Sequence, residues 1–214
     1  MNSFKKTSRI VITVLGIMHL TACAKTVQWE EEVLLNTGET IWITKQVRYT
    51  IKGQPGNPMD MGYLPDFEEI TSFQYGGRNY TYKGDAGIMV LAISPEKVPV
   101  LLALTGRGWG SRNNYPICTV PNYVQLVPDS TGQQWTWPNR IDQWTYNLPA
   151  NLMLKRDHPS EVKRRYTMAD KAQQSYLRDP RLVNSQKINP LAKNPNCANR
   201  VQTPIPDDYP NNKF

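Results

Sequence analysis

The stretch VQWEEEVLLNTGETIWITKQVRYTI, residues 27–51, decides the fold, because apolar and polar residues alternate on both sides of NTG at 36–38. Such alternation is typical of strands that bury one face, and NTG suits a tight turn between them. The apolar face would carry Val27, Trp29, Val33, Leu35, Ile41, Ile43, Val47, Tyr49 and Ile51. The sequence therefore predicts a β-hairpin over residues 27–53.

Six more segments are predicted to be strands, at residues 67–75, 78–84, 86–94, 98–104, 123–127 and 133–137. The glycines at 76–77 and PDSTG at 128–132 would supply hairpin turns. The segments 86–94 and 98–104 are apolar without alternation, which indicates strands buried on both faces. We therefore expect a mainly β fold with C-terminal helices, an antiparallel β-sandwich or a partly closed barrel made of hairpins.

Two segments are predicted to be loops, Gly53–Asp66 and Gly106–Asn122. The first holds three prolines and three glycines, which interrupt strand pairing. Rigid sheets commonly carry binding residues on their loops, so both segments are candidate docking sites for a partner.

The pattern changes to a helical one after Pro138. In 140–155, the residues Ile141, Trp144, Tyr146 and Leu148 follow helical spacing, and TMAD at 167–170 resembles a capping box for a helix over 168–178. We expect helices near 140–179 that close a globular domain of residues 23–180. Residues 181–214 are rich in Asn and Pro, so we expect an irregular tail there.

The N-terminal residues have the pattern of a lipoprotein signal peptide over residues 1–22. Three basic residues precede an apolar run of thirteen residues, 10–22, whereas a membrane span needs roughly 20. LTAC at 20–23 resembles the lipobox of bacterial lipoproteins, which predicts cleavage before Cys23 and its acylation with diacylglycerol and palmitate. The alternatives are an ordinary signal peptide or an uncleaved anchor that contains a cysteine by chance.

The compartment follows from this reading. In enteric-type bacteria an Asp after the lipidated cysteine tends to retain lipoproteins at the inner membrane, so Ala24 favours the outer membrane, facing the periplasm. Removal of residues 1–22 takes away three of the 25 basic residues and none of the 18 acidic ones, which leaves a net charge of +4. Such mild basicity favours an anionic envelope over nucleic acid as a partner.

Two cysteines remain in the mature chain, Cys118 and Cys197. In an oxidising periplasm such a pair predicts a disulfide, and closing a loop of roughly 80 residues contributes about 4 kcal/mol in the chain-entropy model. The alternative is a buried thiol at Cys118 and a free one at Cys197 in the tail.

Few residues offer catalytic chemistry, and we expect neither a metal nor a cofactor. The one histidine of the mature chain, His158, lies in a polar segment, and the G-x-S-x-G and P-loop patterns are missing from the sequence. Four carboxylates, Asp60, Asp66, Glu68 and Glu69, leave open a hydrolase of the glycosidase kind, although Glu68 and Glu69 should point to opposite faces of a strand.

Trp135 and Trp137 share one face of a predicted strand. Exposed rings at this spacing would stack on sugars or on a protein partner, whereas buried rings would fill the core. The first alternative predicts a sugar-binding module.

The segments 27–43, 84–95 and 123–138 resemble a family of Gram-negative bacterial lipoproteins without an assigned activity, over roughly residues 20–155. The resemblance implies lipidation and an envelope location, and it implies no catalytic residue. We therefore expect a lipid-anchored binding or structural module, with the membrane and either an envelope protein or peptidoglycan as partners.

Overall fold

The computed structural model describes residues 24–54, 57–104, 119–138, 140–153, 158–174, 184–194 and 197. The strands are β1 Ala24–Leu34, β2 Thr40–Gln54, β3 Asn57–Tyr75, β4 Arg78–Gly84, β5 Gly87–Ile93, β6 Pro99–Leu104, β7 Tyr123–Pro128, β8 Trp135–Thr136 and β9 Arg165–Tyr166. The short helices are η1 Gln143–Thr145, η2 Pro159–Glu161 and α2 Met168–Ala172.

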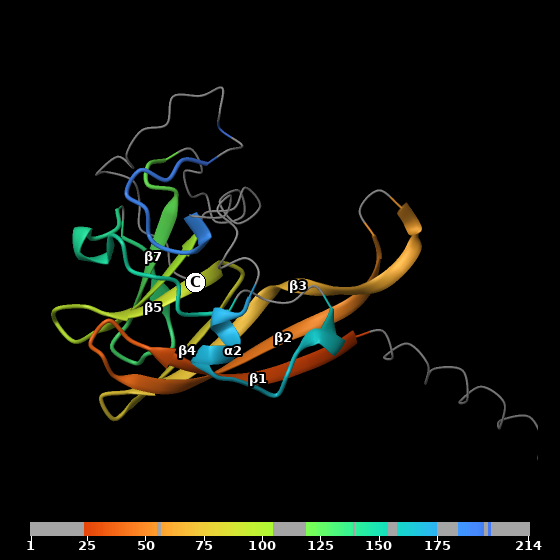
Figure 1. Ribbon diagram of the computed structural model, residues 1–214, viewed down its shortest axis with the longest axis horizontal. Helices are drawn as coiled ribbons and strands as arrows, with labels where there is room; N and C mark the ends of the chain where they lie inside the picture. Colours follow the sequence, from red (N-terminus) through yellow and green to blue (C-terminus); the bar gives the residue numbers. More distant parts are fainter. Residues whose placement is uncertain are drawn as a thin grey trace, which may run out of the picture.

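The strands form two sheets, with the orders β4-β3-β2-β1-β9 and β5-β6-β7-β8 (Figure 1). All pairings between neighbouring strands are antiparallel except the short parallel pair of β1 with β9. The predicted mainly β, sandwich-like fold is confirmed.

The predicted first hairpin is present as β1 and β2. Val27 lies opposite Val47 and Glu31 lies opposite Ile43, in an unbroken antiparallel register. Gly38 closes the turn with a φ of +84°, a conformation that glycine adopts without steric cost. Trp29, Val33 and Ile43 are buried on one face, as the alternation predicts.

The segment Gly53–Asp66 is not a loop, and that prediction is wrong. β2 and β3 continue as a hairpin through the pairs Thr50–Leu64, Ile51–Tyr63 and Gln54–Asn57. β4 pairs only with residues 69–75 of β3, so among the described residues the earlier part of β3 lies at a sheet edge. A proline is tolerated at such an edge because its missing N–H has no ladder partner to serve. We call residues 51–54 and 57–64 the arm, and Figure 1 shows it extending beyond the sandwich.

The core lies between the sheets, and a second apolar layer covers the outer face of β5, β6 and β7. Leu91, Leu101 and Val124 point into the first layer, while Val90, Leu102 and Tyr123 belong to the second. The prediction that the strands at 86–94 and 98–104 are buried on both faces is therefore confirmed.

The helix predicted over 140–155 is reduced to the single turn η1. Asn147 adopts a φ of +64°, which ends any helical path. Beyond it, Asn147 N donates to Ile188 O at 2.7 Å, Ile188 N donates to Leu148 O at 2.9 Å, and Ala150 N donates to Gln186 O at 2.7 Å. The apolar spacing thus belongs to an extended segment paired with a distant one, and only one short α-helix, α2, occurs among the described residues.

Residues 184–194 are irregular, as predicted for the tail, but they are packed against the second sheet. Ile188 and Ala192 are buried in the second apolar layer, and Tyr123 Oη donates to Lys187 O at 3.1 Å. This part of the predicted tail is packed because the outer face of the second sheet supplies an apolar surface for it.

Two asparagine side chains cover the outer edge of β5, which ends the strand order of its sheet. Asn36 accepts from Ile93 N at 2.8 Å and donates to Ile93 O at 2.9 Å. Asn151 accepts from Leu91 N at 2.9 Å and donates to Leu91 O at 2.8 Å and to Leu34 O at 2.9 Å. The two amides replace a neighbouring strand and join β5 to the first sheet.

We expect Asn151→Ala to lower the free energy of unfolding by about 1–3 kcal/mol, because it removes the partners of Leu91 N–H and C=O at the sheet edge. The measurement is urea unfolding followed by circular dichroism. Asn79→Ala, at an exposed position of β4, is the control and should stay within about 0.5 kcal/mol of the parent. Equal losses for the two variants would contradict the proposed role of Asn151.

Candidate functional site

Four charged side chains are buried together on the inner face of the first sheet. They are Glu31 of β1, Lys45 of β2, Glu69 of β3 and Lys171 of α2, and each is at most 7% exposed. We call them the buried charge cluster. Two carboxylates and two ammonium groups leave the cluster without net charge, which is the condition under which buried charges are tolerated.

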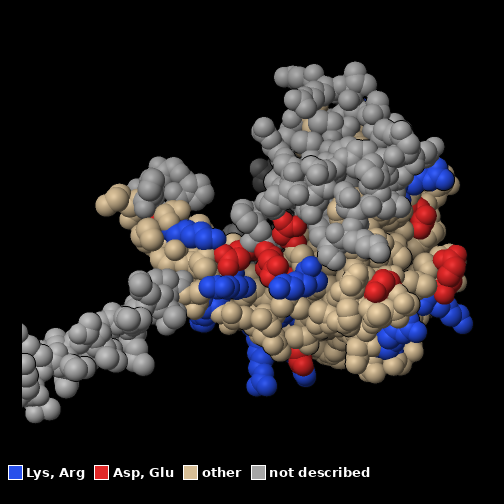
Figure 2. All heavy atoms as spheres, turned by 180° about the vertical axis from the view of Figure 1, so that it is seen from behind, with Lys and Arg blue, Asp and Glu red and all other residues tan. Residues whose placement is uncertain are grey.

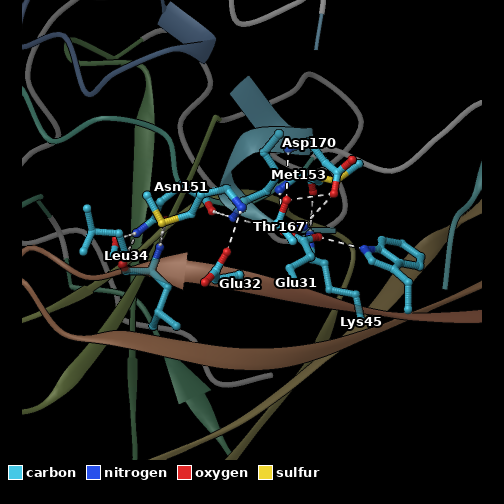
Figure 3. Close-up of polar contacts among 12 residues, drawn as sticks. Glu31, Glu32, Leu34, Lys45, Asn151, Met153, Thr167 and Asp170 are labelled. Atoms are coloured by element: carbon cyan, nitrogen blue, oxygen red, sulfur yellow. Dashed lines mark hydrogen bonds and ion pairs between the residues drawn. The ribbon is translucent and has the colours of Figure 1, made fainter. Parts of the chain in front are cut away.

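Glu31 is the most completely satisfied member of the cluster (Figure 3). Its Oε1 accepts from Trp29 Nε1 at 2.8 Å, and its Oε2 accepts from Met153 N at 2.9 Å. Lys171 Nζ lies 3.8 Å from the same Oε2. Direct bonds from the indole and the backbone offset the cost of removing this carboxylate from water.

Lys45 connects the sheet to the segment that covers it. Its Nζ donates to Met153 O at 2.8 Å and lies 3.6 Å from Glu69 Oε1. Glu69 Oε1 and Thr71 Oγ1 are buried without a hydrogen-bond partner among the described residues. The Glu69 side of the cluster is therefore held by charge attraction, whereas the Glu31 side is held by hydrogen bonds.

Lys171 enters the cluster from α2 and donates to Asn151 O. Burial lowers the pKa of Lys171, and the nearby charge of Lys45 lowers it further, while the Glu31 carboxylate opposes both effects. The ammonium group and Asn151 thus fix α2 to the segment 151–153.

The capping box predicted from TMAD places α2. Asp170 N donates to Thr167 Oγ1 at 3.2 Å, and Thr167 N donates to Asp170 Oδ2 at 3.0 Å. Met168 N donates to Glu32 of β1 at 2.9 Å, which sets the helix against the first sheet. The helix ends at Ala172, earlier than the predicted end at 178.

The buried charge cluster acts as a clamp, in the sense that it joins parts of the chain that are distant in sequence. Three neighbouring strands contribute side chains, and residues 151–153 and α2, more than 100 positions later than Glu31, are bonded to them. All four groups are enclosed, so a substrate has no access to them in this arrangement. We conclude that the buried charge cluster holds the C-terminal half of the chain on the first sheet.

Trp135 and Trp137 are core residues, with 1% and 2% of their surfaces exposed. Trp135 Nε1 donates to Thr81 O at 2.8 Å, and its ring meets Tyr82 edge-on at 6.1 Å. Neither ring is available to stack on a sugar, so the binding-surface alternative is wrong and the core alternative holds.

The candidate carboxylates Asp66 and Asp60 have different surroundings. Partial burial by itself would raise the pKa of Asp66, but hydrogen bonds from Lys52 and Thr50, both at 2.8 Å, and the charges of Lys52 and Arg48 lower it overall. A general acid needs the opposite shift. Asp60 is exposed on the arm.

Glu68 and Glu69 point to opposite faces of β3, as predicted. The Glu68 side chain is 59% exposed and pairs with Lys83, whereas Glu69 belongs to the buried charge cluster. The two carboxylates therefore cannot act on one substrate.

His158 is exposed, as predicted, and caps η2 by accepting from Ser160 N. Cys197 is buried and disulfide-bonded, which agrees with the prediction of a disulfide. Cys23 and Cys118 lie outside the described residues, as does most of the predicted loop Gly106–Asn122, so the pairing with Cys118 stays a prediction.

Sequence reasoning missed two features, the arm and the buried charge cluster. The arm carries two prominently exposed apolar side chains, Met59 at 89% and Met61 at 59%. The alternation of residues could have revealed the cluster. Glu31 and Lys45 occupy positions that, by alternation, face the same side as the buried residues of their strands. Charged residues at such positions indicate buried pairing.

We expect Glu31→Gln to lower the free energy of unfolding by about 3–5 kcal/mol, because it leaves two buried ammonium groups facing one carboxylate. Guanidinium unfolding measures the loss. The neighbouring Glu30→Gln breaks an exposed pair with Arg165 and should cost at most about 1 kcal/mol. A Glu31→Gln protein as stable as the Glu30→Gln control would show that the cluster is not a clamp.

Asp170 should titrate far below an ordinary carboxyl group. The Thr167 backbone N–H and Lys163, together with the Thr167 hydroxyl that donates to Asp170 Oδ2 at 2.9 Å, lower the pKa of Asp170 to about 2. Because the folded-state pKa is below the unfolded value, the capping contribution is complete above about pH 4 and is lost as the pH falls towards about 2. A carboxyl carbon NMR titration measures the midpoint, and Thr167→Ala should raise it. An unchanged midpoint in Thr167→Ala would contradict a contribution from the hydroxyl.

Among the described residues, no helix is long and apolar enough to cross a membrane. The chain matches no protein-family model, no curated protein and no solved structure, so the resemblance to Gram-negative lipoproteins stays a prediction.

Proposed function

We propose that the protein is a lipid-anchored component of the bacterial cell envelope that acts as a binding or structural module. The anchor is the acylated Cys23, released from a signal peptide of residues 1–22, and the domain faces the periplasm from the outer membrane. Its partners are the membrane and either an envelope protein or peptidoglycan.

The observation that carries the proposal is the start of the folded domain directly after the lipobox cysteine. β1 begins at Ala24, and Ala24 already pairs with Thr50 of β2. Consecutive Cα atoms are about 3.8 Å apart, so a lipid on Cys23 would hold the first sheet against the membrane without a linker. A lipoprotein built in this way presents one fixed orientation to its partners.

The arm supports a binding or structural role. It extends past Ala24, the first residue of β1, and carries two exposed methionines. Methionine side chains adapt to irregular apolar surfaces. Tyr63 of the arm packs against the apolar cluster of Trp29, Val47, Tyr49, Met153 and Tyr166, which gives the arm a packed base.

We expect Cys23→Ser to yield an uncleaved precursor that lacks lipid, because the thiol is the acceptor of the diacylglyceryl group. Intact mass and incorporation of labelled palmitate measure the change. Cys118→Ser is the control and should be processed and acylated normally. Normal cleavage of the Cys23→Ser protein would contradict lipidation and favour an ordinary signal peptide.

The binding half of the proposal is tested by crosslinking in living cells, with a photoreactive residue at Met59 of the lipidated protein. One reproducible adduct with an envelope protein, peptidoglycan or lipid would support it. Absence of any adduct, in a protein shown to be acylated, would contradict a role for the arm.

A further inference from the structure

The arm and the beginning of β1 lie at the same end of the molecule. Ala24 pairs with Thr50, and the β2 strand continues for four more residues, Ile51 to Gln54, before the chain turns back into β3. At about 3.3 Å per residue the arm reaches about 13 Å past Ala24 along the strand. Figure 1 shows the arm as the part of the first sheet that continues beyond β1.

The end of the arm exposes apolar side chains. Met59 and Met61 are 89% and 59% exposed, the highest fractions among the large hydrophobic residues of the described chain except Leu191. They are two positions apart at the end of the arm, where the register of β2 with β3 shifts between the pairs Gly53–Met61 and Gln54–Asn57. The two methionines give the end of the arm an apolar surface that favours contact with another apolar surface.

The charged side chains other than Asp60 lie behind the methionines, toward the root of the arm. Arg48 and Lys52 are 63% and 47% exposed, and both pair with Asp66 at the root of the arm. Lys25, also exposed, is the second residue of β1, and the exposed Asp60 lies between the two methionines. Figure 2 shows acidic and basic side chains gathered where the arm meets the body. This arrangement, two methionines and one carboxylate at the end followed by mixed charge, suits a shallow position at a lipid–water interface.

We propose that the arm enters the surface of the membrane beside the acyl chains on Cys23, with Met59 and Met61 in contact with lipid. The inference rests on the proposed function, because the anchor brings the arm to the bilayer. A tethered second contact then forms at high effective concentration, so even two side chains suffice to orient the domain.

The backbone of the arm limits how deeply it enters. β4 pairs with β3 only from Glu69 on, so residues 57–64 have no neighbouring strand on their outer side among the described residues, and an open strand edge is costly in hydrocarbon. The contact is therefore interfacial. The same edge contains Pro58, and Pro65 follows the arm, and both oppose the addition of a strand from a second copy of the chain. A lipid surface fits this arm better than a second copy does.

The test is a fluorophore at the end of the arm in the full, acylated protein. Met61→Cys is labelled with nitrobenzoxadiazole and reconstituted into vesicles of phosphatidylethanolamine and phosphatidylglycerol. Cys197 is disulfide-bonded and does not react. We expect a blue shift and an intensity increase relative to detergent, together with quenching by lipids spin-labelled near the headgroup. Glu96→Cys, exposed in the turn between β5 and β6, is the matched control and should show none of these changes.

The outcomes separate the inference from the proposed function. If intact mass shows the acyl chains but Met61→Cys behaves like Glu96→Cys, the arm does not touch lipid and the inference is overturned. If the label is already shielded in detergent, in proportion to protein concentration, a second copy covers the arm and the inference is again overturned. If the mass lacks acyl chains, the proposed function fails, and the inference that depends on it fails with it.

Discussion

The segment Asn151–Met153 is the connection on which the rest of the structure depends. Asn151 bonds to Leu34 in the first sheet and to Leu91 in the second, and Met153 bonds through its backbone to Glu31 and Lys45. Three residues of irregular chain therefore hold the two sheets at one separation. The partners of these three residues are backbone groups and buried charges. The relative position of the two sheets is therefore defined more specifically than it would be by an apolar contact of equal area.

The buried charge cluster follows from that constraint. Asn151 N and Leu152 N donate to Met89 O of β5, and the other buried peptide groups of this irregular segment need side-chain partners. Glu31 supplies an acceptor for Met153 N–H, and Lys45 and Lys171 supply donors for the carbonyl groups of Met153 and Asn151. The charged groups form their hydrogen bonds with the backbone rather than with one another. This explains why the distances from Lys45 Nζ to Glu69 Oε1, 3.6 Å, and from Lys171 Nζ to Glu31 Oε2, 3.8 Å, exceed hydrogen-bond length.

The sequence was informative where structure is local and misleading where a distant partner decides. Alternation in 27–51 predicted the hairpin of β1 and β2 and its apolar face, and the glycines at 76–77 predicted the turn between β3 and β4. Prolines in 53–66 suggested a loop because their effect depends on whether the strand is central or at an edge, which composition does not contain. The apolar spacing of 140–155 suggested a helix because its extended partner, 186–188, lies some 40 residues later.

The contacts around the candidate site also fix the position of the arm. Trp29, Val47, Tyr49, Met153 and Tyr166 form a separate apolar cluster over the root of the arm, against which Tyr63 of the arm packs. Met153 belongs both to this cluster and to the bonds of Glu31 and Lys45, so the covering segment is fixed by charge at one end and by apolar contact at the other. A projecting hairpin without such a base would sway independently of the body. With it, the direction of the arm and the first residue of β1 are set by the same contacts, and an anchor on Cys23 would orient both together.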